Sequence, residues 1–234
     1  MAKDRTQARR EHLAQMRAAQ QRKERRSAMI MWGAGAFVIV LIVGLVGFYV
    51  VRERAATSLD GVAQFSYKAG SHTPIKVNYK ESPPVGGEHN DRWQQCGPYE
   101  QPINNENAVH SMEHGAVWIT YRPDLPKAQV DKLKGLITSD YLLLSPYPGL
   151  KAPVVASSWN HQITLKGADD PRLARYIQKY KQNPSTTPEY GATCSGDGAV
   201  TTTTAQAPIP ATPPTGAPPS SAPESPAPSA TPGS

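Results

Sequence analysis

The sequence predicts one α/β domain, with a mixed α+β fold as the alternative, between an N-terminal membrane-spanning helix and a proline-rich tail. An uncharged apolar run covers residues 29–51. Strand-like and helix-like patterns alternate between residues 61 and 194, a length typical of one domain. Residues 195–234 hold ten of the 23 prolines and almost no large apolar group, so we expect a disordered tail.

The net charge of +6 lies entirely in residues 1–28, which hold nine basic and three acidic residues. The rest of the chain is neutral overall, so it lacks the basic surface that binds a phosphate backbone, and nucleic acid is excluded as a partner. The arm is rich in Gln, Ala, Glu and Arg without a break. This composition predicts a solvated helix that continues into the apolar run.

The apolar run is long enough to cross a membrane once. Its 23 residues, at ~1.5 Å each, span a hydrocarbon core of about 30 Å. A cleaved signal peptide is the rival interpretation, but its apolar region would be only about 7 to 15 residues long. Because Lys and Arg beside a span favour the cytoplasmic side, we expect a single-pass protein of the cell membrane with residues 1–28 in the cytoplasm. A linker, residues 52–60, would then lead to a compact extracytoplasmic domain at residues 61–194.

Within the domain, residues 116–121 are apolar on both alternating faces, which indicates a central strand. Residues 127–137 predict a helix after Pro126, and residues 141–144 a second strand, so the three form a βαβ unit. The other expected elements are strands at residues 63–67 and 75–79, a hairpin from residues 154–156 and 163–165, and a last helix beginning at Pro171.

The two cysteines, Cys96 and Cys194, both fall on the outward side. An oxidising compartment and an even count favour a disulfide between them, which would clamp the end of the domain. The alternatives are that Cys96 is a thiolate ligand of a metal or that both thiols are free.

The densest chemical motif is HSMEHG at residues 110–115. Positions i and i+4 share one face of a helix, so His110 and His114 can offer two imidazoles to one ion with Glu113 nearby. A further ligand is required, and His89 and His72 are the candidates. The predicted metal set is His89, His110, Glu113 and His114. Imidazole ligands and the nearby Met112 make copper as reasonable as zinc.

Three other interpretations of this motif stay open. The order His-x-x-Glu-His is that of inverted zinc peptidases, in which the acid activates a metal-bound water. Those enzymes place the motif inside a long helix, whereas Gly115 ends any helix here, so no catalytic residue is assigned. In the second interpretation, His110, Glu113 and His114 form hydrogen bonds within the domain and brace it. In the third, they form part of a surface that binds a partner. His161, beside Trp159, is expected to be a hairpin residue rather than a ligand.

Several motif positions resemble one family. They are PPVGGEH at residues 83–89, Trp93, Cys96-Gly97, Tyr99, Pro102, VHSMEHGAV at residues 109–117, and Tyr121. This pattern resembles the bacterial and archaeal domain-of-unknown-function family 3105 over residues 61–194. Many members have Ser-Gly-Pro-His where this chain reads GGEH at residues 86–89. The resemblance implies a membrane anchor, a single outward domain and a late cysteine, and it assigns no activity.

The sequence therefore predicts a membrane-anchored, outward-facing domain that binds a transition metal, copper or zinc. The alternatives are a metal-free interaction module of the cell envelope and a zinc-dependent hydrolase. The expected partners are the lipid bilayer and an envelope protein or cell-wall component. The tail would serve as a spacer or solubilising segment, or else as a glycosylated stalk or a docking ligand.

Overall fold

The computed structural model describes residues 2–138 and 140–212, and the chain divides into two units between Thr57 and Ser58. The first unit is a single helix, α1 (Ala2–Ala56), which joins the predicted arm and the apolar run without interruption. Its stretch Gln15–Ala56 is long and apolar enough to cross a membrane, a property that a signal sequence or a core helix can share. The hydroxyl of Thr57 donates to the carbonyl of Glu53 and satisfies one acceptor of the last turn.

The second unit is built on a six-stranded mixed sheet of order β1-β6-β5-β3-β4-β2. The strands are β1 (Ala63–Gln64), β2 (Gly97–Pro98), β3 (Val117–Tyr121), β4 (Leu142–Pro146), β5 (Val154–Ser158) and β6 (His161–Leu165). β4 pairs in parallel with β3 and β2, and the remaining pairs are antiparallel. Every residue of β3, β4 and β5 is buried, so the centre of the sheet is covered on both faces.

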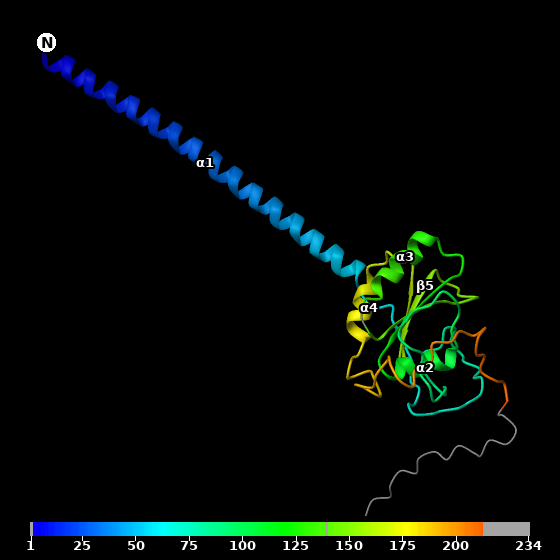
Figure 1. Cartoon of the computed structure of the whole chain (residues 1–234). Helices are drawn as coiled ribbons and strands as arrows, with labels where there is room; N and C mark the ends of the chain where they lie inside the picture. Colours follow the sequence, from blue (N-terminus) through cyan, green and yellow to red (C-terminus); the bar gives the residue numbers. More distant parts are fainter. Residues whose placement is uncertain (1, 139, 213–234) are drawn as a thin grey trace, which may run out of the picture. The chain divides into compact units, whose positions relative to one another are not determined.

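Three helices cover the sheet: α2 (Asn105–Glu113) on one face, and α3 (Lys127–Leu136) and α4 (Arg172–Tyr180) on the other (Figure 1). Each face has its own apolar core. The core beneath α2 contains Ile103, Ala108, Val109, Met112, Trp118, Leu143 and Trp159. Helix α2 thus turns its apolar side to the sheet, and its opposite side is left to contact the loops that follow residue 66.

The mixed α/β class is confirmed, as are the βαβ unit formed by β3, α3 and β4 and the β5–β6 hairpin. The predicted strand at residues 75–79 is wrong, because this stretch has no strand pairing. Its backbone donors bond elsewhere. The N–H of Lys76 donates to the carbonyl of Pro210 at 2.7 Å, and that of Val77 to a carboxylate oxygen of Glu106 at 2.9 Å. The early strand predicted at residues 63–67 is reduced to the two residues of β1.

The folded domain extends past Cys194, the boundary at which the sequence places the start of the tail. Val200 exchanges backbone hydrogen bonds with Trp93 and Gln95 at 2.9 and 2.8 Å. Further along, the Asn104 amide donates to the carbonyl of Ala207 at 2.6 Å. Most of the groups in these bonds belong to the backbone. The amino-acid composition, from which the tail was predicted, therefore gives no sign that residues 195–207 are bound to the domain. The remainder of the predicted tail, residues 213–234, lies outside the described residues.

Candidate metal centre

Helix α2 carries the densest part of the site. His110 and Glu113 lie one turn apart near its end, and His114 is the C-cap residue that follows. Gly115 has a φ of 95°, the left-handed backbone that lets the chain leave the helix and begin β3. The helix therefore ends where the sequence predicts, after nine residues. It is too short to resemble the long helix of an inverted zinc peptidase.

Two loop histidines are brought against this helix by pairing with each other. His72 and His89 form an isolated parallel bridge, in which the N–H of Thr73 donates to the carbonyl of His89 at 2.7 Å. The ring of His72 stacks on that of His110, with centroids 5.0 Å apart and an interplanar angle of 7°. The side chain of His89 is fully buried, whereas that of His72 is 38% exposed.

Three imidazole rings are oriented in the same way, each with its Nδ1 atom on a backbone carbonyl. The pairs are His89 with Gly87 at 2.7 Å, His110 with Asn90 at 2.6 Å, and His114 with Thr193 at 2.6 Å. Because a carbonyl oxygen only accepts, each Nδ1 carries the proton, and a neutral ring keeps a lone pair on Nε2. Burial lowers the pKa of His110 to about 4, so this ring is neutral at pH 7. Proteins commonly orient imidazole ligands of metals through such bonds.

Glu113 faces these rings with one carboxylate oxygen that has no hydrogen-bond donor. Its Oε1 accepts from the N–H of Gly70 at 2.7 Å. Its Oε2 lies 2.8 Å from Nε2 of His89 and 3.9 Å from Nε2 of His72. The 2.8 Å pair has ion-pair distance but not hydrogen-bond geometry, so both buried atoms are without a hydrogen-bond partner.

These atoms form the first of two overlapping groups, which we call the inner position. It comprises His72, His89, His110 and Glu113, whose ligand atoms all lie within 4.8 Å of one another. Ligand atoms on one tetrahedral zinc ion are about 3.3 Å apart. The distances of 2.8 and 3.9 Å from the Glu113 oxygen bracket this value. The inner position thus offers up to three nitrogens and one oxygen to a single ion.

The second group, which we call the outer position, comprises His110, His114 and Glu189. The Nε2 atoms of His110 and His114 lie 2.9 Å apart, and Nε2 of His114 lies 3.1 Å from a carboxylate oxygen of Glu189. The Glu189 side chain is 43% exposed, so this position opens to solvent. His110 belongs to both groups.

Residues 182–194, which we call the capping segment, lead from α4 back to the end of α2. The N–H of Gln182 donates to the carbonyl of Gly115 at 2.9 Å, and that of Glu189 to the carbonyl of Glu113 at 3.1 Å. The capping segment therefore satisfies carbonyls at the end of the ligand-bearing helix and fixes the backbone of Glu189 beside it.

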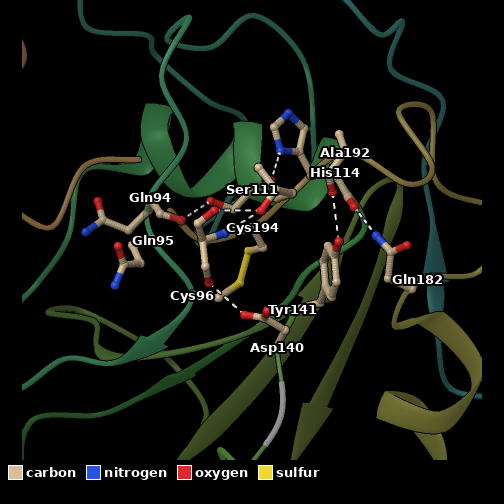
Figure 2. Close-up of a disulfide and its surroundings, with 12 residues drawn as sticks. Gln94, Gln95, Cys96, Ser111, His114, Asp140, Tyr141, Gln182, Ala192 and Cys194 are labelled. Carbon is tan, nitrogen blue, oxygen red and sulfur yellow. Dashed lines mark hydrogen bonds between the residues drawn. A yellow bond between two sulfur atoms is a disulfide. The ribbon is translucent and has the colours of Figure 1, made fainter. Parts of the chain in front are cut away.

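A disulfide anchors the capping segment. Cys194 pairs with Cys96, with Cα atoms 5.5 Å apart, and the N–H of Cys96 donates to the carbonyl of Cys194 at 2.9 Å. Figure 2 shows this disulfide beside the end of α2, near His114. Because both sulfurs are in the disulfide, the alternative of a Cys96 thiolate ligand is wrong for this structure.

The four residues predicted as metal ligands all lie in this cluster, but they do not form one group. His89, His110 and Glu113 meet at the inner position together with His72, whereas His114 lies at the outer position. Glu189 was missed by sequence reasoning. The one signal for it was weak: no other acidic residue lies between residues 171 and 194.

Two other sequence interpretations are decided by packing. Met112 is fully buried and packs in the apolar core beneath α2, so the argument for copper from a soft ligand loses support. His161 belongs to neither metal group. Its Nδ1 lies 2.8 Å from the carbonyl of Trp159, and its ring contacts that of Tyr180 with centroids 4.5 Å apart.

Two family models match parts of the chain. A model described as an inhibitor of host cell division protein domain matches residues 7–67, a region that consists mostly of α1. No curated protein and no solved structure matches the chain. A model described as a protein of unknown function, DUF3105, matches residues 72–196, more than half of the chain, and includes both metal groups and both cysteines. The chain belongs to the DUF3105 family.

Proposed function

We propose that this domain binds one divalent transition ion, zinc or copper, at the inner position through His72, His89, His110 and Glu113. The observation that supports this most strongly is the contact between Nε2 of His89 and Oε2 of Glu113. Both atoms are buried, 2.8 Å apart and without a hydrogen-bond partner. A lone pair that faces a carboxylate is unfavourable unless a positive charge lies between them, and a metal ion supplies that charge.

The ligand set also indicates what the ion does. Neutral imidazoles and a carboxylate suit zinc and divalent copper. Four protein ligands close a tetrahedral site, whereas a catalytic zinc keeps one position open for water or substrate. The inner position therefore supports binding or storage of an ion, or stabilisation by it, rather than hydrolysis.

A metal-free interaction module is the second candidate, and one contact favours it. A doubly protonated His114 would donate its Nδ1 proton to Thr193, and its Nε2 proton would lie between His110 and Glu189 at the distances of 2.9 and 3.1 Å. This arrangement needs no ion at the outer position. It does not account for the unpartnered atoms of His89 and Glu113.

Metal content tests the proposed function. We expect the full chain, dialysed against zinc or copper(II) and then freed of loose ion, to retain about one ion per chain. At a free ion concentration of 100 times Kd, binding stabilises the fold by about 2.7 kcal/mol, so a chelator should lower the melting temperature. The variant His161→Ala is the matched control, since it removes an imidazole from neither group and should retain the ion. A wild-type chain without bound ion contradicts the proposal.

We also propose that the protein crosses the cell membrane once, with its arm in the cytoplasm and its domain outside. The apolar stretch of α1, the basic residues before it and the disulfide in the domain support this arrangement, because disulfides persist in oxidising compartments. The partners that fit are the lipid bilayer and, at the domain, an envelope protein or a cell-wall component.

Orientation can be tested with single cysteines added at two exposed positions, Lys151→Cys in the domain and Ala18→Cys in the arm. In intact cells a membrane-impermeant maleimide should label the first variant and should label the second only after lysis. The opposite pattern, or labelling of both only after lysis, would place the domain inside the cell.

A further inference from the structure

We infer that an ion reaches the inner position through the outer position, so that His114 and Glu189 form a loading site for a metal that His110 then hands inward. This inference rests on the proposed function at the inner position. It assigns a role to the two cluster residues that the inner position does not use.

The two positions exclude each other because they share one ligand. His110 uses Nδ1 to hold the carbonyl of Asn90 at 2.6 Å, so only its Nε2 is available to an ion. That nitrogen has a single lone pair and can bind one ion at a time. The two adjacent positions share one ligand, so they can hold a single ion at either place but cannot hold two ions at once.

Burial gives the direction of movement. The side chains of His89 and Glu113 are fully buried, whereas that of Glu189 is 43% exposed. A hydrated cation would meet the Glu189 carboxylate first, and His114 stands between this carboxylate and His110 at 3.1 and 2.9 Å. A negative charge at the mouth of a site raises the local concentration of cations and their rate of association.

The outer ligands are held in place as a built site rather than gathered by chance. The N–H of Glu189 donates to the carbonyl of Glu113, and the carbonyl of Thr193 fixes the ring of His114. The ring of Trp93 lies against both imidazoles, with its centroid 5.0 Å from that of His114 and 5.9 Å from that of His110. These contacts aim the Nε2 atom of His114 at the shared ligand.

The transfer needs only ligand exchange. The ion first binds Glu189 and His114 and releases water, then adds the Nε2 lone pair of His110. Bonds to Glu113, His89 and His72 form as those to Glu189 and His114 break. The ion keeps its oxidation state and the Nδ1 protons stay on the rings. The proton that joins the Nε2 atoms of His110 and His114 in the metal-free hydrogen bond is released to water as the ion binds.

The rival route leads past His72, whose side chain is 38% exposed and borders the inner position directly. The two routes differ in what Glu189 contributes. If the ion passes His72, the charge on Glu189 is irrelevant to the rate. If the ion loads at the outer position, loss of that charge slows both entrance and exit without changing the final ligands.

Rapid-mixing measurements on the metal-free full chain distinguish the routes. Zinc uptake would be followed with a zinc-responsive dye, and release would be followed after mixing the loaded protein with excess chelator. We expect Glu189→Gln, which keeps its backbone bond to Glu113, to slow both processes about tenfold while stoichiometry and Kd stay at the wild-type values. Glu100→Gln is the matched control, because it removes an exposed carboxylate paired with Lys134, in neither metal group, and should leave both rates unchanged.

Unchanged rates in Glu189→Gln would overturn the inference in favour of the route past His72. Faster release with a weaker Kd would overturn it as well, because Glu189 would then be a ligand of the resting ion. The first result leaves the proposed function intact. The second would place the resting ion at the outer position, and so would also contradict the inner position as its binding site. A wild-type chain that binds no zinc overturns the proposed function itself, and this is established before any variant is compared.

Discussion

Replacing both Cys96 and Cys194 with Ala is expected to lower the free energy of unfolding of the domain by about 4 to 5 kcal/mol. The disulfide joins residues that are 98 positions apart, and in the chain-entropy account a loop of about this length restricts the unfolded chain by that amount. Alanine suits these positions because Cys194 is fully buried and a serine hydroxyl would need a partner there. Guanidinium unfolding followed by tryptophan fluorescence would measure the change.

Wild-type protein treated with a thiol reductant provides the control, since it should lose a similar free energy while the double variant is insensitive to the reductant. The capping segment should loosen in both cases, because Cys194 follows Thr193, whose carbonyl holds the ring of His114. A double variant that unfolds within about 1 kcal/mol of the oxidised wild type would show that the disulfide contributes little.

The substitution Glu113→Gln is expected to weaken metal binding more than about 100-fold, beyond the loss typical of a residue that only supports a ligand. The metal-free domain should remain at least as stable as the wild type. A glutamine keeps an oxygen for the N–H of Gly70 and directs its amide N–H toward the unpartnered Nε2 of His89. Affinity by dye competition and unfolding of the metal-free protein would give the two quantities.

The stability measurement separates the metal site from a structural ion pair. If His89 were a buried cation paired with Glu113, loss of the carboxylate would leave an unpaired charge and cost about 3 to 5 kcal/mol. A strongly destabilised Glu113→Gln domain would therefore contradict the assignment of these two residues as metal ligands. The His161→Ala variant should retain the wild-type metal affinity.

The elements that could be predicted from the sequence are those with a local apolar pattern. The strands β3 and β5 and the helices α3 and α4 carry their periodicity within ten residues, and each formed close to its expected place. Residues 75–79 alternate between apolar and polar side chains, a pattern that also predicts a strand, but they form none. Their backbone donors are taken by Glu106 and Pro210, which are distant in sequence, and no local pattern records this.

The same division applies to the candidate site. Helical spacing alone places His110, Glu113 and His114 at one end of a helix, so these ligands could be found in advance. The grouping of His72 with His89 depends on a bridge between loops, and that of Glu189 depends on a segment that the disulfide anchors. Sequence reasoning could name the histidines but could not divide them between two positions.

Crystals of the zinc-loaded protein, with anomalous scattering recorded at the zinc absorption edge, would locate the ion and so test the inner position itself. We expect one peak about 2.0 to 2.2 Å from Nε2 of His89, Nε2 of His110 and a carboxylate oxygen of Glu113, with His72 as the fourth ligand. A loaded protein with no peak among these side chains, or with its zinc held elsewhere in the chain, would contradict the proposed metal site.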